Sequence, residues 1–401
     1  MDIENIRIKN LLELLAALII WAVMLHCAIA RLDRPLIAGA VLLGVMLLAG
    51  VLVFYEWSYR LLIPIMAAAV FTVLNYMFVQ EYGAISLLSM NITFMSVALF
   101  LFLEENLNIP FWGINCLLMA AMVMFYWLRS PDGYILFYHT SRNYISVYLL
   151  IFMFIYCLAL EKADRDFPFW IVLGYLLCCI SGLGRGGILV GCLAAFLFFI
   201  NKFYLNREVS YKVRQFYSIL GIVIFLLCFL VFLWKRDMII ETVFSRFLEN
   251  NNMSNNLRRV YIMKYLTIKN SIPALLLGKN TYNLTMDLKL VGGNLHNSYF
   301  MTHAYTGLGG VVLVFFSAIA GVVKLIKNRH MDLAIIVTLF FFRAMTDYLF
   351  PDHLGDIIVW FCFFLAFGKE DFKCAVKERP QPVCDVIKRE NNPKIPQYEG
   401  E

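Results

Sequence analysis

The stretch YISVYLLIFMFIYCLAL, residues 144–160, decides the fold class of this chain. It carries no charged side chain. As an α-helix it would extend about 25 Å, close to the thickness of the hydrocarbon core of a bilayer. Comparable apolar runs recur along the 401 residues. They predict about twelve transmembrane helices, at 11–30, 36–55, 61–79, 84–103, 111–128, 144–160, 167–183, 186–200, 216–234, 304–323, 333–350 and 355–368.

The composition points the same way. Hydrophobic residues make up 61% of the chain and charged residues 15%, whereas soluble domains have about 45–50% and about 25%. A soluble protein of this size could not hide so much apolar surface, because its outside must carry charge. The composition excludes a soluble enzyme, a nucleic-acid-binding protein and a disordered chain, and it predicts an all-α polytopic integral membrane protein.

Lys and Arg are concentrated in the segments that would be cytoplasmic if the N-terminus is inside. This bias sets the orientation of membrane helices, so both termini are predicted to be cytoplasmic. Residues 1–234 would hold spans 1–9. Residues 235–295 would form a large extracytoplasmic loop, with short amphipathic helices that lie over the membrane domain. Residues 296–368 would hold spans 10–12. Residues 369–401 contain several prolines among mixed charges and would form a disordered cytoplasmic tail.

A glycine-rich turn, Gly182-Leu183-Gly184-Arg185-Gly186-Gly187, separates two predicted spans on the outer side. Glycines let backbones approach closely. The fork of guanidinium donors on Arg185 suits a phosphate or diphosphate. The alternative is a tight turn with an arginine that reaches the membrane surface, and the sequence leaves both interpretations open.

Within the outer loop, Arg258 and Arg259 would lie about 100° apart on a helix. Both could face a lipid headgroup while Leu257, Val260 and Tyr261 pack below them. Without other evidence, a solvated basic face is the simpler interpretation of this pattern.

The segment His296-Asn297-Ser298-Tyr299 leads into the tenth predicted span. Asn297 or Ser298 can cap the helix that begins there. A histidine at this junction can take a proton from a hydroxyl near neutral pH. His303 follows seven positions later, on the same predicted helical face, and Gly307 would let another helix pack closely. The alternative for His296 is a structural role.

Arg343 and Asp347 lie at i,i+4 within the eleventh predicted span, a spacing that permits an ion pair. Polar groups at membrane depth are costly, so each needs a partner or a function. A buried pair that fixes helix packing is the favoured interpretation, and a role in lining a polar cavity is the alternative.

Together these segments resemble the superfamily of bacterial O-antigen polymerases and O-antigen ligases. The resemblance rests on the Gly-Arg-Gly-Gly turn, the large late outer loop, the arginine followed by Pro273 and Gly278, and His296 with Gly307 eleven positions later, which matches an H-x10-G signature. It covers residues from about 140 to 350 and implies a metal-independent, cofactor-free inverting glycosyltransferase.

The resemblance also implies roles for individual residues. His296 would be the base that activates the acceptor hydroxyl. Arg185, with Arg258 or Arg259, would hold the diphosphate of an undecaprenyl-diphosphate-linked oligosaccharide. Some members carry an R-x10-G signature that neither Arg185 nor Arg258 completes, so Arg142 at another outer junction is a further candidate.

We therefore predict a repeat-unit polymerase for O-antigen, capsule or exopolysaccharide in a bacterial plasma membrane, working beside a flippase and a chain-length regulator. An O-antigen ligase is the near alternative. A flippase or other transporter of lipid-linked sugars is the alternative from a different class. The outer-face clustering of the informative charges favours an enzyme over a transporter.

Overall fold

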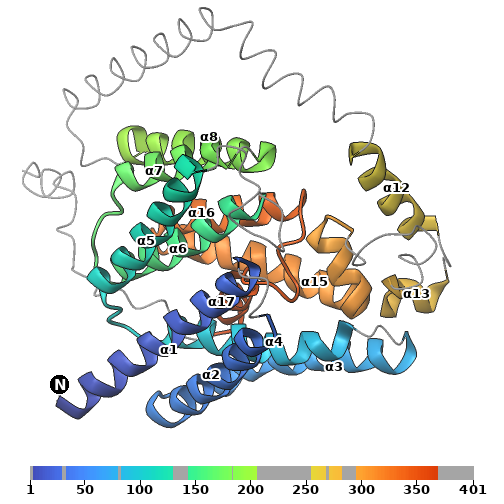
Figure 1. The fold of residues 1–401 in the computed structure, drawn as a ribbon. Coiled ribbons are helices and arrows are strands. Elements are labelled where there is room, and N and C mark those ends of the chain that lie inside the picture. The colour runs from blue at the N-terminus through green and yellow to red at the C-terminus, as the bar shows by residue number, and fades with distance from the viewer. Residues whose placement is uncertain are drawn as a thin grey trace, which may run out of the picture.

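A computed structural model describes residues 3–28, 33–79, 83–129, 143–182, 184–205, 254–267, 271–281 and 295–368. Within these ranges the chain is helical and has no strand (Figure 1). The α-helices are α1 (Ile3–Ala28), α2 (Asp33–Phe54), α3 (Leu62–Phe78), α4 (Gly83–Leu103), α5 (Ile109–Arg129), α6 (Tyr144–Lys162), α7 (Phe169–Ser181), α8 (Arg185–Ile200), α12 (Ser254–Thr267), α13 (Ile272–Leu277), α15 (Ser298–Lys327), α16 (Met331–Ala344) and α17 (Asp356–Phe367).

The helices agree with the predicted class of helical membrane protein. Each predicted span that falls on described residues overlaps a helix. Seven helices in the described part are long and apolar enough to cross a membrane, and three shorter apolar helices accompany them. The ninth predicted span, 216–234, and the predicted tail, 369–401, lie outside the described residues. The count of twelve therefore stays a prediction.

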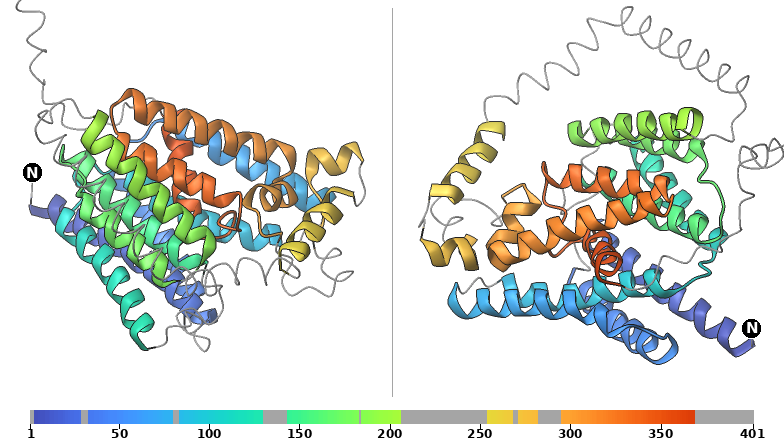
Figure 2. Two further views of the ribbon diagram at one scale, coloured as in Figure 1. Left: turned by 90° about the horizontal axis from the view of Figure 1, so that it is seen from above. Right: turned by 180° about the vertical axis from the view of Figure 1, so that it is seen from behind.

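Helix α6, the stretch that decided the fold class, forms the centre of the bundle. Nearly all of its side chains are buried, and α5, α7, α8 and α16 pack around it (Figure 2). Helices such as α2 and α3 instead carry large apolar side chains on their outer surface, including Val53 and Phe78. Apolar residues on both the inside and the outside of a bundle are expected where the outside faces lipid.

Contacts between helix ends define the two ends of the bundle. At one end, Arg343 near the end of α16 reaches Asn143, just before α6. At the other end, His330 before α16 pairs with Glu161 near the end of α6, at 3.0 Å. The views of Figures 1 and 2 place α12 and α13 at the end opposite the start of α1, as expected if the N-terminus and the loop lie on opposite sides of the membrane.

Helix α15 is two helices joined by a sharp reversal, not the single straight span predicted at 304–323. Gly307 has φ 68° and ψ −169°, outside the helical region. The rings of Tyr299 and Phe315 stack with their centroids 4.5 Å apart, although a straight helix would hold them about 24 Å apart. The segment before Gly307 therefore folds back along the segment that follows it.

The described part of the predicted outer loop supports this reversal. Helices α12 and α13 fall within the segment predicted as that loop, and α13 packs against α15 and α3. A Cβ on Gly307 would lie 2.0 Å from the carbonyl oxygen of Leu276, and one on Gly278 would lie 2.4 Å from that of His303. Both glycines are required because two backbones meet here without room for a side chain.

Candidate functional site

His296 lies directly before the first turn of α15. The Oδ1 of Asn297 accepts hydrogen bonds from the backbone N–H of Tyr299 and Phe300, at 3.0 and 3.1 Å, so Asn297 is the predicted helix cap. His296 has φ 52° and is outside the helix. The expectation that it shares a helical face with His303 is therefore wrong.

His303 instead ties α12 and α13 to α15. Its Nδ1 lies 2.6 Å from the hydroxyl of Tyr265, and its Nε2 lies 2.8 Å from the carbonyl oxygen of Leu275. Both ring nitrogens thus contact the loop. The geometry gives His303 a structural role and leaves His296 as the candidate base.

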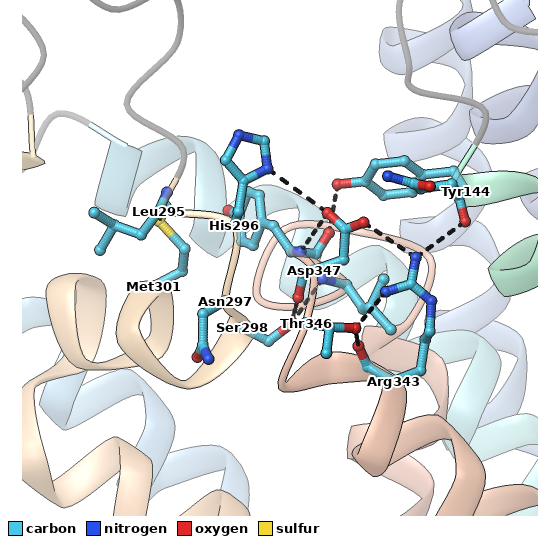
Figure 3. A network of polar contacts seen from close by, with 12 residues as sticks. Tyr144, Leu295, His296, Asn297, Ser298, Met301, Arg343, Thr346 and Asp347 are labelled. Atoms are coloured by element: carbon cyan, nitrogen blue, oxygen red, sulfur yellow. Dashed lines mark hydrogen bonds and ion pairs between the residues drawn. The ribbon is translucent and has the colours of Figure 1, made fainter. Parts of the chain in front are cut away.

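The side chain of His296, just before α15, faces that of Asp347, in the connection after α16 (Figure 3). Its Nδ1 lies 3.8 Å from the Oδ1 of Asp347, and its second ring nitrogen points away from this carboxylate. The histidine side chain is 34% exposed and the aspartate side chain only 3%. The separation is longer than a hydrogen bond, so the buried carboxylate faces the partly exposed imidazole without bonding it directly.

Arg343 forms the predicted i,i+4 ion pair with Asp347. Its Nη2 lies 3.1 Å from the Oδ2 of Asp347, and its Nη1 donates to the hydroxyl of Thr346 at 2.7 Å. Both charged side chains are almost completely buried. The two carboxylate oxygens of Asp347 therefore face different partners, arginine on one side and His296 on the other, so the pair belongs to the same site as the histidine.

The glycine-rich turn packs directly on this arginine. A Cβ on Gly186 would lie 2.9 Å from the Cζ of Arg343. Arg185, the preceding residue, is the first of α8, and the helix begins at Gly184, which has no side chain to cap it. The structure thus brings the predicted diphosphate-binding turn next to Arg343, the ion-pair partner of Asp347, and the amino end of a helix favours an anion.

The other predicted arginines are not placed at the site. Arg142 lies outside the described residues. Arg258 and Arg259 belong to α12 by their backbone, but their side chains are not among those described. Of the arginines predicted to bind the donor, Arg185 is therefore the one whose side chain is described, so the contacts around it can be compared with those around His296.

Ser298 forms hydrogen bonds to the connection after α16. The sequence predicted Ser298 only as a possible helix cap. Its hydroxyl donates to the carbonyl oxygen of Asp347 at 2.9 Å and accepts from the N–H of Leu349 at 2.7 Å. Tyr144 donates to the carbonyl oxygen of Tyr348 at 2.5 Å. These contacts hold residues around Asp347 in a non-helical connection, which is why α16 ends at Ala344 and the predicted span 333–350 is too long.

A second polar cluster follows in the same connection. The Oδ2 of Asp356 accepts hydrogen bonds from the N–H of Asp352 at 2.6 Å and of His353 at 3.2 Å. Burial raises the pKa of Asp352 to about 7, and its Oδ1 has no hydrogen-bond partner among the described residues. The ring of His353 lies 4.3 Å from that of Tyr348, and burial lowers its pKa to about 4.

The site lies at the end of the bundle where α6 begins and α16 ends. Arg343 contacts Asn143, and Tyr144 contacts Tyr348. From Ser298 at the site, the first segment of α15 extends about 13 Å to the reversal at Gly307.

A histidine–aspartate pair beside a buried arginine, with a helix start packed on that arginine, can accept a proton and stabilise an anion in one place. Non-helical backbone at membrane depth is tolerated where it is buried in protein or lines a polar cavity, and such positions are commonly functional. No protein-family model, curated protein or solved structure matches this chain.

Proposed function

We propose that this protein is a polysaccharide repeat-unit polymerase. It transfers a glycan from undecaprenyl diphosphate to a hydroxyl of an acceptor sugar at the outer face of a bacterial plasma membrane. The observation that carries this proposal is the His296–Asp347 pair, with Arg343 on the other oxygen of Asp347 and the turn that contains Arg185 packed on Arg343.

In the proposed reaction, His296 takes the proton of the acceptor hydroxyl through the ring nitrogen that points away from Asp347. The hydroxyl oxygen forms a bond to the anomeric carbon, the bond from that carbon to the diphosphate breaks, and the lipid diphosphate leaves with the electron pair. Attack from the opposite face inverts the anomeric centre. Asp347 stabilises the imidazolium, and Arg185 offsets the charge that develops on the diphosphate.

The position of the site at one end of the helical bundle suits a substrate that is itself anchored in lipid. A polyprenyl tail holds the diphosphate near the membrane surface, where the end of the bundle that carries His296 would meet it. The termini would be cytoplasmic, as the charge bias predicts. A flippase that delivers the lipid-linked unit and a chain-length regulator are the expected partners.

Purified protein with lipid-linked repeat units in detergent tests the activity. We expect a ladder of polymer from the wild type and none from His296→Ala, with the loss confined to the chemical step. Transport requires a sealed vesicle and polymerisation does not, so a ladder in detergent excludes a transporter. Long polymer that persists on its lipid carrier in a deletion strain would contradict the polymerase and indicate a ligase.

His330→Ala is the matched control for this experiment. His330 forms a histidine–carboxylate pair with Glu161 at 3.0 Å, similar in kind to the candidate pair but at the opposite end of the bundle. Its loss removes a comparable interaction without touching the site. Equal polymer from the two variants would remove His296 from the proposed mechanism.

A further inference from the structure

Helices α12 and α13 expose large apolar side chains on the surface that faces away from the bundle. In α12, Tyr261 and Tyr265 are buried, whereas Val260, expected to pack inward, is exposed together with Met263 and Leu266. A helix between protein and water places polar residues on its outer face. The described exposed side chains of α12 are instead three large apolar ones beside Thr267, a mixture that is expected where a helix lies at a lipid–water boundary.

The same feature is stronger in α13, whose sequence IPALLL has no polar side chain. Ile272 is 75% exposed, and Leu275 and Leu276 are each more than half exposed. A cluster of exposed apolar side chains marks a surface that contacts a protein, a ligand or a membrane.

This exposed face is held firmly in place. Asn75 of α3 donates hydrogen bonds to the carbonyl oxygens of Leu277 and Ala304, at 2.6 and 2.7 Å. Lys279 donates to the carbonyl oxygen of Tyr265 at 2.7 Å. With the close contact of Leu276 on Gly307, these bonds fix α13 at the reversal of α15.

The reversal lies at the level of the membrane surface. The segment of α15 after Gly307 has about 20 residues and extends about 30 Å, the thickness of the hydrocarbon core. The neighbouring end of α3 exposes Tyr76, Met77 and Phe78. The apolar surface of α13 therefore continues the lipid-facing surface of two spanning helices at the depth where the hydrocarbon core begins.

We propose that α13 and the outer face of α12 lie in the outer leaflet of the bilayer as interfacial helices, with Ile272, Leu275 and Leu276 among the acyl chains. The occupant of this surface is lipid, because the exposed face of α13 is uncharged, continuous with membrane-facing helices and fixed at their level. This inference does not depend on the proposed chemistry.

Site-specific photocrosslinking tests the proposal. p-Benzoylphenylalanine is placed at Leu275, and in a second variant at Ile272, of the full-length protein in phosphatidylcholine–phosphatidylglycerol vesicles. Intact mass after illumination separates lipid adducts from crosslinks between protein chains. Met66, exposed on α3, is the lipid-facing reference, and Glu56, exposed between α2 and α3, is the aqueous reference.

We expect both loop positions to give lipid adducts at a level near that of Met66 and at least threefold above that of Glu56. Adduct levels equal to that of Glu56 would overturn the proposal. A dominant crosslink to a second copy of the chain would also overturn it, because the apolar face would then be a protein interface. Using two loop positions keeps the test decisive if one variant fails to fold.

Discussion

Replacing Gly307 by alanine tests whether the reversal of α15 builds the site. The backbone at φ 68° and ψ −169° lies in a region that is essentially restricted to glycine, and a side chain there costs about 1–3 kcal/mol. The added Cβ would lie 2.0 Å from the carbonyl oxygen of Leu276, and overpacking of this kind costs about 1–3 kcal/mol more. The free energy of unfolding is therefore expected to fall by about 2–6 kcal/mol, which is a large part of the stability of a typical domain.

Thermal unfolding of the purified variant in detergent measures this loss, and the polymer ladder measures the effect on the site. We expect a melting temperature lowered by several degrees and little polymer, because the reversal positions the segment that begins at Ser298. Gly174→Ala is the matched control. A Cβ at that position in α7 meets nothing within 4 Å, so stability should be unchanged or slightly higher.

The reasoning would be refuted if Gly307→Ala had the stability and the polymer yield of Gly174→Ala. In that case the glycine would not be required by its conformation or by the contact with α13. A variant that loses stability but retains full activity when folded would separate the two claims, since the reversal would then support the fold without placing His296.

Three further changes have distinct expected results. Arg343→Met leaves the buried Asp347 without its ion-pair partner and should lower the free energy of unfolding by about 3–5 kcal/mol. Arg343→Lys should retain part of that stability in thermal unfolding. Equal melting temperatures for the Met and Lys variants would contradict the assigned ion pair. Asn75→Ala leaves two carbonyl oxygens unsatisfied and should cost about 2–4 kcal/mol, against a smaller loss for Thr72→Ala, whose hydroxyl bonds only within its own helix. The pKa of Asp352 is raised to about 7. Its protonated form therefore stabilises the fold fully below pH about 4, and this stabilisation is lost as the pH rises through 7. Asp352→Asn should flatten the fall in melting temperature between pH 5.5 and 8, and an unchanged slope would count against the raised pKa.

The sequence by itself determined the helical membrane class and where most helices lie. Long apolar runs such as 144–160 form helices in a bilayer because each backbone polar group must be satisfied within its own segment. The cap at Asn297 and the ion pair of Arg343 with Asp347 were also predicted correctly. Both depend on residues within a few positions of each other in the chain, so their partners are near at hand whatever the rest of the bundle does, although Asp347 itself lies beyond the end of α16.

Only the tertiary structure decided how the site is assembled. Hydropathy does not reveal the reversal at Gly307, because the residues on both sides are apolar and the reversal depends on α13 entering from the outer loop. It does not show that His296 faces Asp347, about fifty positions along the chain, or that Gly186 packs on Arg343. Such contacts depend on which helix ends meet, and that is set by the packing of the whole bundle, not by any local pattern.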